Sequence, residues 1–208
     1  MVKTKIAVLV SGGGTNLQAL LDAQAAGRIP HGEIALVVSN RADAYALERA
    51  KKANVPAVAL PGKDFEPRLT AALQSAGIEM MILAGFLKIL SADFTKKWPS
   101  RILNVHPALI PSFCGEGFYG LKVHEAALRY GVKVTGATVH YVNEIPDGGE
   151  IILQKAVDVL PGDTPEMLQR RVMEEAEWVL LPKAAEIVAE KLAQASPWCP
   201  RGGGRPQA

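Results

Sequence analysis

The sequence predicts an α/β protein with a Rossmann-like, doubly wound sheet that is mostly parallel and becomes mixed in the C-terminal half. Over the first hundred residues, short β-branched runs alternate with amphipathic stretches, the pattern of a parallel sheet covered by helices. After Pro107, two longer strand-like runs have no obvious helix between them, which indicates paired strands. A chain of 208 residues with 49% hydrophobic content can bury one substantial core, so we expect a single domain over residues 1–195.

The expected elements follow a regular order along the chain. Five buried strands are predicted at residues 5–10, 33–39, 56–60, 80–84 and 101–105. Helical patterns at 16–27, 43–53 and 68–77 separate the first four strands, and the first and last of these patterns end in a glycine suited to a C-cap. This alternation is typical of doubly wound folds. Two further strands, at 134–142 and 150–159, are expected to pair with each other.

A long helix is expected to close the domain over residues 165–194. Thr164 suits the N-cap and Pro165 suits the first helical position, where its missing N–H costs nothing. Pro182 lies inside the pattern and is expected to kink or divide the helix. The remaining residues, 196–208, are rich in Pro and Gly and are expected to form a disordered tail.

Composition and charge exclude several classes of function. Lys and Arg number 23 against 21 Asp and Glu, and they are scattered, so no nucleic acid partner is expected. The apolar run near the start is too short for a signal peptide or a membrane span, so we expect a cytoplasmic protein without membrane contact. Cys114 and Cys199 are far apart with no C-x-x-C pair, which predicts free thiols.

The stretch SGGGTNLQAL, after the first strand, predicts an anion site. Its glycines allow close backbone approach, and the following helix directs free N–H groups and its positive dipole end at the loop. The lysine of a P-loop is missing, and Leu17 occupies the last glycine position of G-x-G-x-x-G, so we expect no nucleotide cofactor. One phosphate monoester fits better. The alternative is a glycine turn that only permits close packing of strand and helix.

Three other motifs are ambiguous when each is taken alone. Lys88 in AGFLKILS is compatible with a lysine whose stem packs on the core. A histidine at a strand end, such as His106 beside Asn104, is usually a packing residue. Asp147 between a proline and two glycines most often bonds to its own turn.

Taken together and in this order, the motifs resemble the folate-dependent glycinamide ribonucleotide formyltransferases. The resemblance runs from KIAVLVSGGGTNLQALLDA through ILAGFLKILS, NVHPALIPSF and VTGATVHYVNEIPDGGEIILQ to the closing helix. It implies the formyltransferase fold, without a dinucleotide, in which the N-terminal half holds the ribonucleotide and the C-terminal half the folate. The implied reaction moves the formyl group of 10-formyltetrahydrofolate, a co-substrate, to the amine of 5'-phosphoribosylglycinamide. The products are formylglycinamide ribonucleotide and tetrahydrofolate, in de novo purine biosynthesis.

The resemblance also implies catalytic roles. Asn104 corresponds to an oxyanion donor, His106 to the catalytic imidazole, and Asp147 to a carboxylate that orients this imidazole and favours its protonated form. These residue types suit the chemistry, because attack by the amine puts negative charge on the formyl oxygen and a proton must then reach the departing N10.

The implied substrate contacts are more numerous. For the ribonucleotide they are Gly13, Gly14, Thr15, Asn16, Leu17, Glu174 and Glu177. For the folate they are Lys63, Leu87, Lys88, Ile89, Leu90, Asn104, His140, Asn143, Glu144, Ile145, Pro146 and Asp147. In the segment 87–90 the backbone is expected to hold the pteridine head.

Two positions depart from the usual family pattern. The stretch 113–124 is longer than in many relatives and is expected either to reshape the amine-side pocket or to join a homodimer contact. Ala108 stands where serine is common, which removes no catalytic group.

Several alternatives remain open from the sequence. The chain could be a formyltetrahydrofolate hydrolase or another N10-formyl transferase, although it shows neither of the extra domains that these enzymes carry. A cysteine hydrolase would use Cys114 with His106 or His124. From a different class, a non-catalytic module that binds a phosphometabolite would need only the glycine loop. A metal site from His106, His140 and Asp147 lacks the helical spacing of zincins, so no metal is expected.

Overall fold

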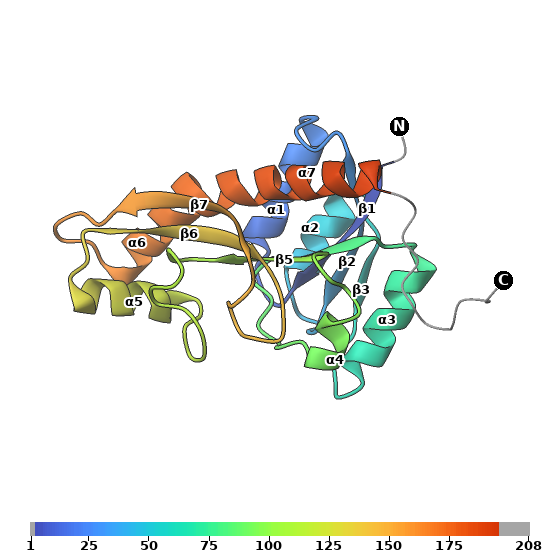
Figure 1. The fold of residues 1–208 in the computed structure, drawn as a ribbon, viewed down its shortest axis with the longest axis horizontal. Coiled ribbons are helices and arrows are strands. Elements are labelled where there is room, and N and C mark those ends of the chain that lie inside the picture. Colours follow the sequence, from blue (N-terminus) through green and yellow to red (C-terminus); the bar gives the residue numbers. More distant parts are fainter. Residues whose placement is uncertain (1–2, 196–208) are drawn as a thin grey trace.

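A seven-stranded sheet with helices on both faces forms the core of the protein (Figure 1). The computed structural model describes residues 3–195, so the expected tail at 196–208 and Cys199 lie outside the described residues. The strand order is β3-β2-β1-β4-β5-β6-β7. The strands are β1 Thr4–Val10, β2 Gly32–Ser39, β3 Ala57–Ala59, β4 Met80–Leu83, β5 Ile102–His106, β6 Val134–Tyr141 and β7 Ile151–Asp158.

Strand direction confirms the predicted fold class. β1 to β5 pair in parallel, whereas β6 runs antiparallel to β5 and β7 antiparallel to β6. Every predicted strand therefore exists, with bounds that differ by only one or two residues from those expected.

The alternation of side chains along β1 explains why both faces are covered. Ile6, Val8 and Val10 join the core beneath α1 and α7, while Ala7 and Leu9 join the core beneath α3. Because successive strand residues point to opposite faces, a strand that is apolar throughout needs a layer of helices on each side. The three predicted helices are present as α1 Thr15–Ala25, α2 Ala46–Lys52 and α3 Phe65–Ser75, and α7 is Trp178–Gln194.

Two helices were not expected from the sequence. The short helix α4, Ala92–Thr95, begins at Ser91, whose hydroxyl accepts from the N–H of Phe94. The longer α5, Leu121–Tyr130, buries Val123 and Ala127 and ends at Gly131 in a left-handed conformation. The stretch 113–124 is thus a loop only as far as residue 120.

The closing helix is divided, but not where the sequence suggested. Thr164 caps α6, Pro165–Val172, by accepting from the N–H of Met167, as predicted. The interruption is a π-helical segment, Met173–Glu177, whereas Pro182 lies inside the continuous α7. Pro182 therefore does not divide the helix, whereas a kink at Pro182 stays a prediction.

The fold brings the predicted motifs to one edge of the sheet. Strand order reverses between β1 and β4, and in open parallel sheets ligands bind beyond the carboxyl ends at such a point. The glycine loop follows β1, the segment 85–90 follows β4, and His106 ends β5.

Candidate active site

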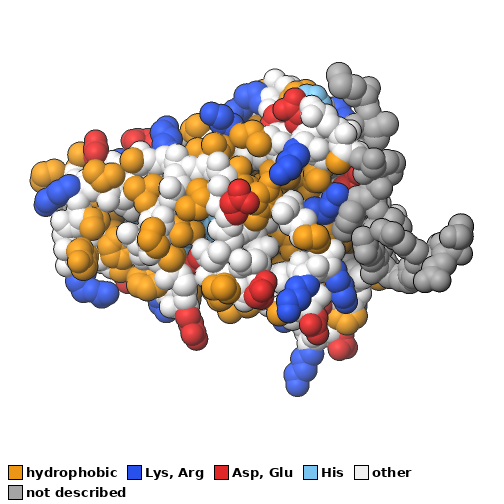
Figure 2. Space-filling view, in the orientation of Figure 1, with side chains coloured by type: hydrophobic (Ala, Val, Ile, Leu, Met, Phe, Trp, Pro, Cys, Tyr) orange, Lys and Arg blue, Asp and Glu red, His pale blue; other side chains and the backbone are white. Residues whose placement is uncertain are grey.

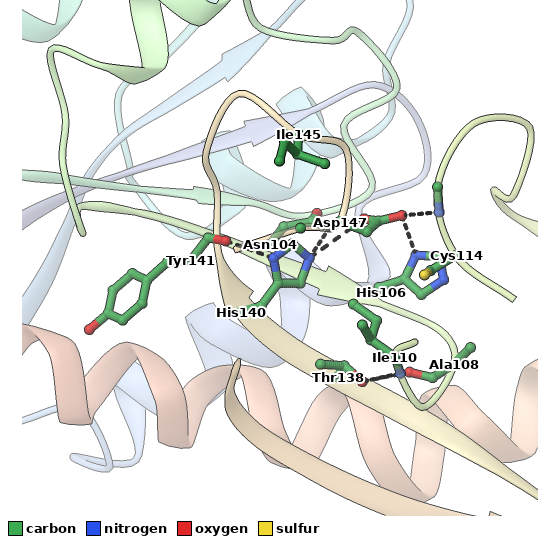
Figure 3. A network of polar contacts seen from close by, with 12 residues as sticks. Asn104, His106, Ala108, Ile110, Cys114, Thr138, His140, Tyr141, Ile145 and Asp147 are labelled. Carbon is green, nitrogen blue, oxygen red and sulfur yellow. Dashed lines mark hydrogen bonds and ion pairs between the residues drawn. The ribbon is translucent and has the colours of Figure 1, made fainter. Parts of the chain in front are cut away.

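His106 and Asp147 meet at the end of β5 (Figure 3). The His106 ring is almost completely buried, with Nδ1 3.5 Å from Oδ2 of Asp147. Its other nitrogen, Nε2, lies 2.8 Å from the carbonyl oxygen of Phe113, so Nε2 carries a proton in this arrangement. A second proton on Nδ1 would let the ring donate to both partners. Gain of a proton at Nδ1 would therefore turn the contact between His106 and Asp147 into a charged hydrogen bond.

The electrostatics of this pair differ in one respect from the expectation. Burial lowers the pKa of His106, and the neighbouring Asp147 carboxylate, which raises it, does not compensate fully. Asp147 thus favours the protonated form of His106, as the sequence predicted, but burial outweighs this effect and the net result is a lowered pKa. Burial alone would raise the pKa of Asp147, but contacts with His140, the Gly115 amide and His106 outweigh it and lower that pKa. Asp147 is consequently ionised beside a mainly neutral histidine.

Asn104 lies on the same strand, two residues before His106. Its Nδ2 is 3.2 Å from Nε2 of His140 and 3.5 Å from Oδ1 of Asp147. The amide therefore directs its N–H groups towards His140 and Asp147. His140, a predicted folate contact, is only 1% exposed and donates from Nδ1 to the carbonyl of Tyr141 at 2.7 Å.

The loop between β6 and β7 holds Asp147 by backbone constraints. Asp147 has a φ of 54°, and Asn143 shapes the loop by accepting from the N–H of Ile145 and donating to the carbonyl of Gly148. A Cβ at Gly149 would lie 1.7 Å from the carbonyl oxygen of Tyr141, so only glycine fits there. The D-x-G sequence is thus explained by close packing of the loop on β6.

The segment after β5 closes the site from the other side. The N–H of Gly115 donates to Oδ2 of Asp147 at 2.9 Å, while the Phe113 carbonyl accepts from His106. Between them, Cys114 is a free thiol whose pKa is raised by burial and by Asp147. His124, buried on α5, has a pKa lowered to about 4 by burial and by His106. An uncharged thiol beside a carboxylate disfavours the cysteine-hydrolase alternative.

The glycine loop is built to present N–H groups. The carbonyls of Gly12, Gly13 and Gly14 accept from the Ala46 amide, from Nε of Arg49 and from the Gln18 amide, respectively. Since these acceptors are engaged, the loop and the first turn of α1 offer mainly donors to a ligand. A cavity of about 310 Å³ adjoins the loop, lined by Thr15, Gln18, Ala19, Asp22, Arg28, Arg49 and Trp178.

Asn16 and Glu177 form a buried pair beside this loop. Nδ2 of Asn16 donates to Oε2 of Glu177 at 2.7 Å, across from α1 to the π-helical segment. Burial raises the pKa of Glu177 to about 7, although the Asn16 hydrogen bond lowers it. π-Helical turns often occur at functional sites. The fold thus brings together two predicted ribonucleotide residues that are far apart in sequence.

Three other predicted ribonucleotide residues lie outside the buried pair of Asn16 and Glu177. Leu17 is completely buried, so any contact with a ligand falls to its backbone. Glu174 is exposed and forms an ion pair with Arg170 at 2.8 Å. The hydroxyl of Thr15 lies 3.9 Å from the sulfur of Met173.

The predicted folate segment, residues 87–90, follows β4. Leu87 and Ile89 are 63% and 76% exposed, whereas Leu90 is buried. Lys88 places Nζ 5.6 Å from the ring centre of Phe65. Ile145, 60% exposed, adds an apolar side chain from the β6–β7 loop (Figure 3).

Two further predicted folate contacts are Lys63 and the backbone of residues 87–90. Lys63 is exposed in the loop before α3. The N–H of Leu87 already donates to the hydroxyl of Ser11. Folate contacts through the backbone would therefore fall to the other groups of the segment.

Three contributors to the site were not found from the sequence. Ser11 links the loop after β1 to the segment after β4, since its hydroxyl accepts from the N–H of Leu87; it also donates to Asn40. Arg49 supports the glycine loop, and the Gly115 amide supports Asp147. Only Ser11 carried a signal, because it directly follows β1; the other two depend on tertiary packing.

One cluster of possible metal ligands lies near the start of β2. Within residues 3–195, the ligand atoms of His31, Glu186 and Glu190 all lie within 4.8 Å of one another, close to the start of β2 and away from His106. In the same range, no helix combines the length and apolar character needed to cross a membrane. On the face shown in Figure 2, Lys and Arg are scattered among acidic side chains.

Comparisons with known proteins agree with this geometry. The formyl transferase family matches residues 4–184. A phosphoribosylglycinamide formyltransferase of Haemophilus influenzae is 43% identical over 82% of this chain and 81% of that protein. The trifunctional purine biosynthetic protein adenosine-3 of Drosophila pseudoobscura is 43% identical over 90% of this chain, which spans only 14% of that protein.

A solved structure gives the same result for the fold. The crystal structure of glycinamide ribonucleotide transformylase 1 from Symbiobacterium toebii superposes with a TM-score of 0.84 at 44% identity, covering 91% of this chain and 89% of that one. By its sequence over residues 4–184 and by its fold, the chain belongs to the formyl transferase family, among the phosphoribosylglycinamide formyltransferases.

Proposed function

We propose that the chain transfers the formyl group of 10-formyltetrahydrofolate to the amine of 5'-phosphoribosylglycinamide. The single observation that carries this proposal is the convergence of Asn104, His106 and Asp147 at one end of the sheet, beside a loop that offers N–H donors. A module that only binds a phosphometabolite would need the loop but not these three side chains.

In the proposed reaction, the glycinamide amine attacks the formyl carbon. Negative charge then develops on the formyl oxygen, and Nδ2 of Asn104 supplies an N–H group on the carboxylate side of the site. Leu87, Ile89 and Ile145 provide an exposed apolar surface suited to the flat ring of a folate.

A proton must then move from the new ammonium to the departing N10. His106, mainly neutral and hydrogen-bonded through Nε2, accepts this proton on Nδ1, where the ionised Asp147 stabilises the resulting imidazolium. Return of the proton to N10 completes the transfer, with no covalent enzyme intermediate.

The phosphate of the acceptor fits the glycine loop. A helix N-terminus favours an anion, and the engaged glycine carbonyls leave donors facing the ligand. We also propose that Asn16 helps to bind the phosphate and that Glu177 binds the ribose. We further propose that the protein acts in the cytoplasm and that the 113–120 loop contributes to a homodimer contact.

The decisive experiment compares acceptors at a fixed concentration of 10-formyltetrahydrofolate. We expect 5'-phosphoribosylglycinamide to be formylated with a far higher kcat/KM than its dephosphorylated analogue. Equal values for the two acceptors would remove the loop from the substrate site. Release of free formate without acceptor formylation would instead identify a formyltetrahydrofolate hydrolase.

A further inference from the structure

His140 occupies a position that suits orientation of another side chain better than ligand binding. It lies on β6 directly opposite Asn104 of β5, and only 1% of it is exposed. Its ring contacts Tyr141, Asn104 and Asp147, and Figure 3 shows it beneath the loop that bears Asp147. The residue is therefore behind the reacting groups, within the sheet.

The hydrogen bonds of the ring indicate where its proton lies. Nδ1 is 2.7 Å from the carbonyl oxygen of Tyr141, an acceptor only, so Nδ1 must be the donor. Nε2 of the singly protonated ring then has a lone pair and accepts from Nδ2 of Asn104 at 3.2 Å. The 3.5 Å separation from Asp147 would suit an ion pair only if Nε2 also carried a proton. Because the ionised Asp147 carboxylate also requires the N–H end of the Asn104 amide, Nε2 of His140 faces a donor and carries the lone pair.

This tautomer decides which end of the Asn104 carboxamide faces the site. With Nδ2 inward, Asn104 donates to His140 and approaches Oδ1 of Asp147 at 3.5 Å. The flipped amide would set its oxygen against the His140 lone pair and the carboxylate, two repulsive contacts. To stabilise an oxyanion, the Asn104 carboxamide must present its N–H end and not its oxygen.

We propose that His140 is a positioning residue that fixes the orientation of the Asn104 carboxamide through the lone pair on Nε2. The proposal rests on the formyl transfer proposed above. It assigns His140 a different role from the folate contact implied by the sequence resemblance.

Substitutions separate these roles. His140→Leu removes the acceptor, whereas His140→Gln can place a carboxamide oxygen near the position of Nε2. Thr135→Val is the matched control, because Thr135 is a buried residue of the same strand whose hydroxyl has no hydrogen-bond partner among the described residues.

Steady-state kinetics should distinguish orientation from binding. For His140→Leu we expect kcat to fall about 10- to 100-fold, the usual loss when an orienting partner is removed, with KM for both substrates nearly unchanged. His140→Gln should recover most of this loss, and Thr135→Val should match the unmodified protein. Adding His140→Leu to Asn104→Ala should cost little more than Asn104→Ala alone, because both remove one function.

Two results would overturn the proposal. A rise in the folate dissociation constant as large as the fall in rate would make His140 a folate ligand. Losses that multiply in the double variant would show that the two residues act independently.

A spectroscopic measurement keeps the inference testable without activity. Nitrogen-15 NMR of the substrate-free protein should show the His140 ring protonated on Nδ1, and His140→Leu should expose the Asn104 side-chain amide to faster hydrogen exchange. Protonation on Nε2 instead would contradict the proposal even if the enzyme is active. If formyl transfer itself is not observed, the NMR result still decides the orientation of Asn104.

Discussion

At the scale of single residues, burial outweighs the effect of the polar partners on the pKa values of His106 and Glu177. His106 and Glu177 are both shifted towards their neutral forms, although each has a polar partner at hydrogen-bonding or ion-pair distance. For His106, a pKa below its usual value keeps Nδ1 free to take up a proton during the reaction. The same effect at Glu177 gives the protein a measurable dependence of stability on pH.

Glu177 should make the folded protein less stable as pH rises. Below pH of about 4.5 the carboxyl is protonated in both states and costs nothing. Between about 4.5 and 7 the unfolded state ionises while the folded state retains its proton, so stability falls. At about 1.36 kcal/mol per pKa unit, the full loss above pH 7 is roughly 3 kcal/mol.

Urea unfolding at pH 5 and pH 8 tests this prediction. Glu177→Gln should remove most of the loss at pH 8, whereas Glu175→Gln, an exposed residue of the same turn, should behave like the unmodified protein. Equal pH dependence in Glu177→Gln and the parent chain would show that Glu177 is not the group responsible.

At the scale of elements, two loops rather than the strands determine the geometry around Asp147. The β6–β7 loop places Asp147 at a φ of 54°, and the 113–120 loop supplies the Gly115 amide that binds its carboxylate. Such contacts between loops depend on tertiary packing, so the sequence motif identified Asp147 but not the Gly115 amide that binds it.

Gly115 provides a test of this support. Its φ is +88° with open space around it, so Gly115→Ala introduces backbone strain of about 1–3 kcal/mol without a clash. We expect the loop to relax, the contact with Asp147 to lengthen, and kcat to fall about tenfold or more, since small misplacements are costly in catalysis.

Gly117→Ala is the matched control. Gly117 has a φ of +86° in the same loop, also with open space, but Asp147 accepts from Gly115. Its alanine variant should lose similar stability and little activity. Equal losses of kcat in both variants would mean that loop strain alone, and not support of Asp147, controls the rate.

At the scale of the whole molecule, the sequence predicted most of the fold and the edge of the sheet at which the predicted site residues gather. Apolar runs identified all seven strands, and the rule that ligands bind beyond the carboxyl ends pointed to the loop after β1 and to His106 at the end of β5. Antiparallel pairing of β6 and β7 followed from their separation by a turn rather than a helix.

Features that depend on tertiary burial could not be predicted from the sequence. α5 was missed, although Gly131 marked its end, and the break in the closing helix was assigned to Pro182 instead of the π-helical segment. The net pKa shift of His106 could not be foreseen, because it depends on how completely β6 and the 113–120 loop cover the ring. The substrate roles of the individual residues stay predictions.

The most direct test of the central claim is single-turnover formyl transfer at saturating substrate, in folded variants of His106 and Asp147. We expect His106→Ala and Asp147→Asn each to lose about 10²- to 10⁴-fold, as for general acid–base groups, with both substrates still bound. Because the proton on His106 Nδ1 is stabilised by Asp147, the double variant should lose little more than the worse single variant. A near-normal rate in His106→Ala, or losses that multiply in the double variant, would contradict the account.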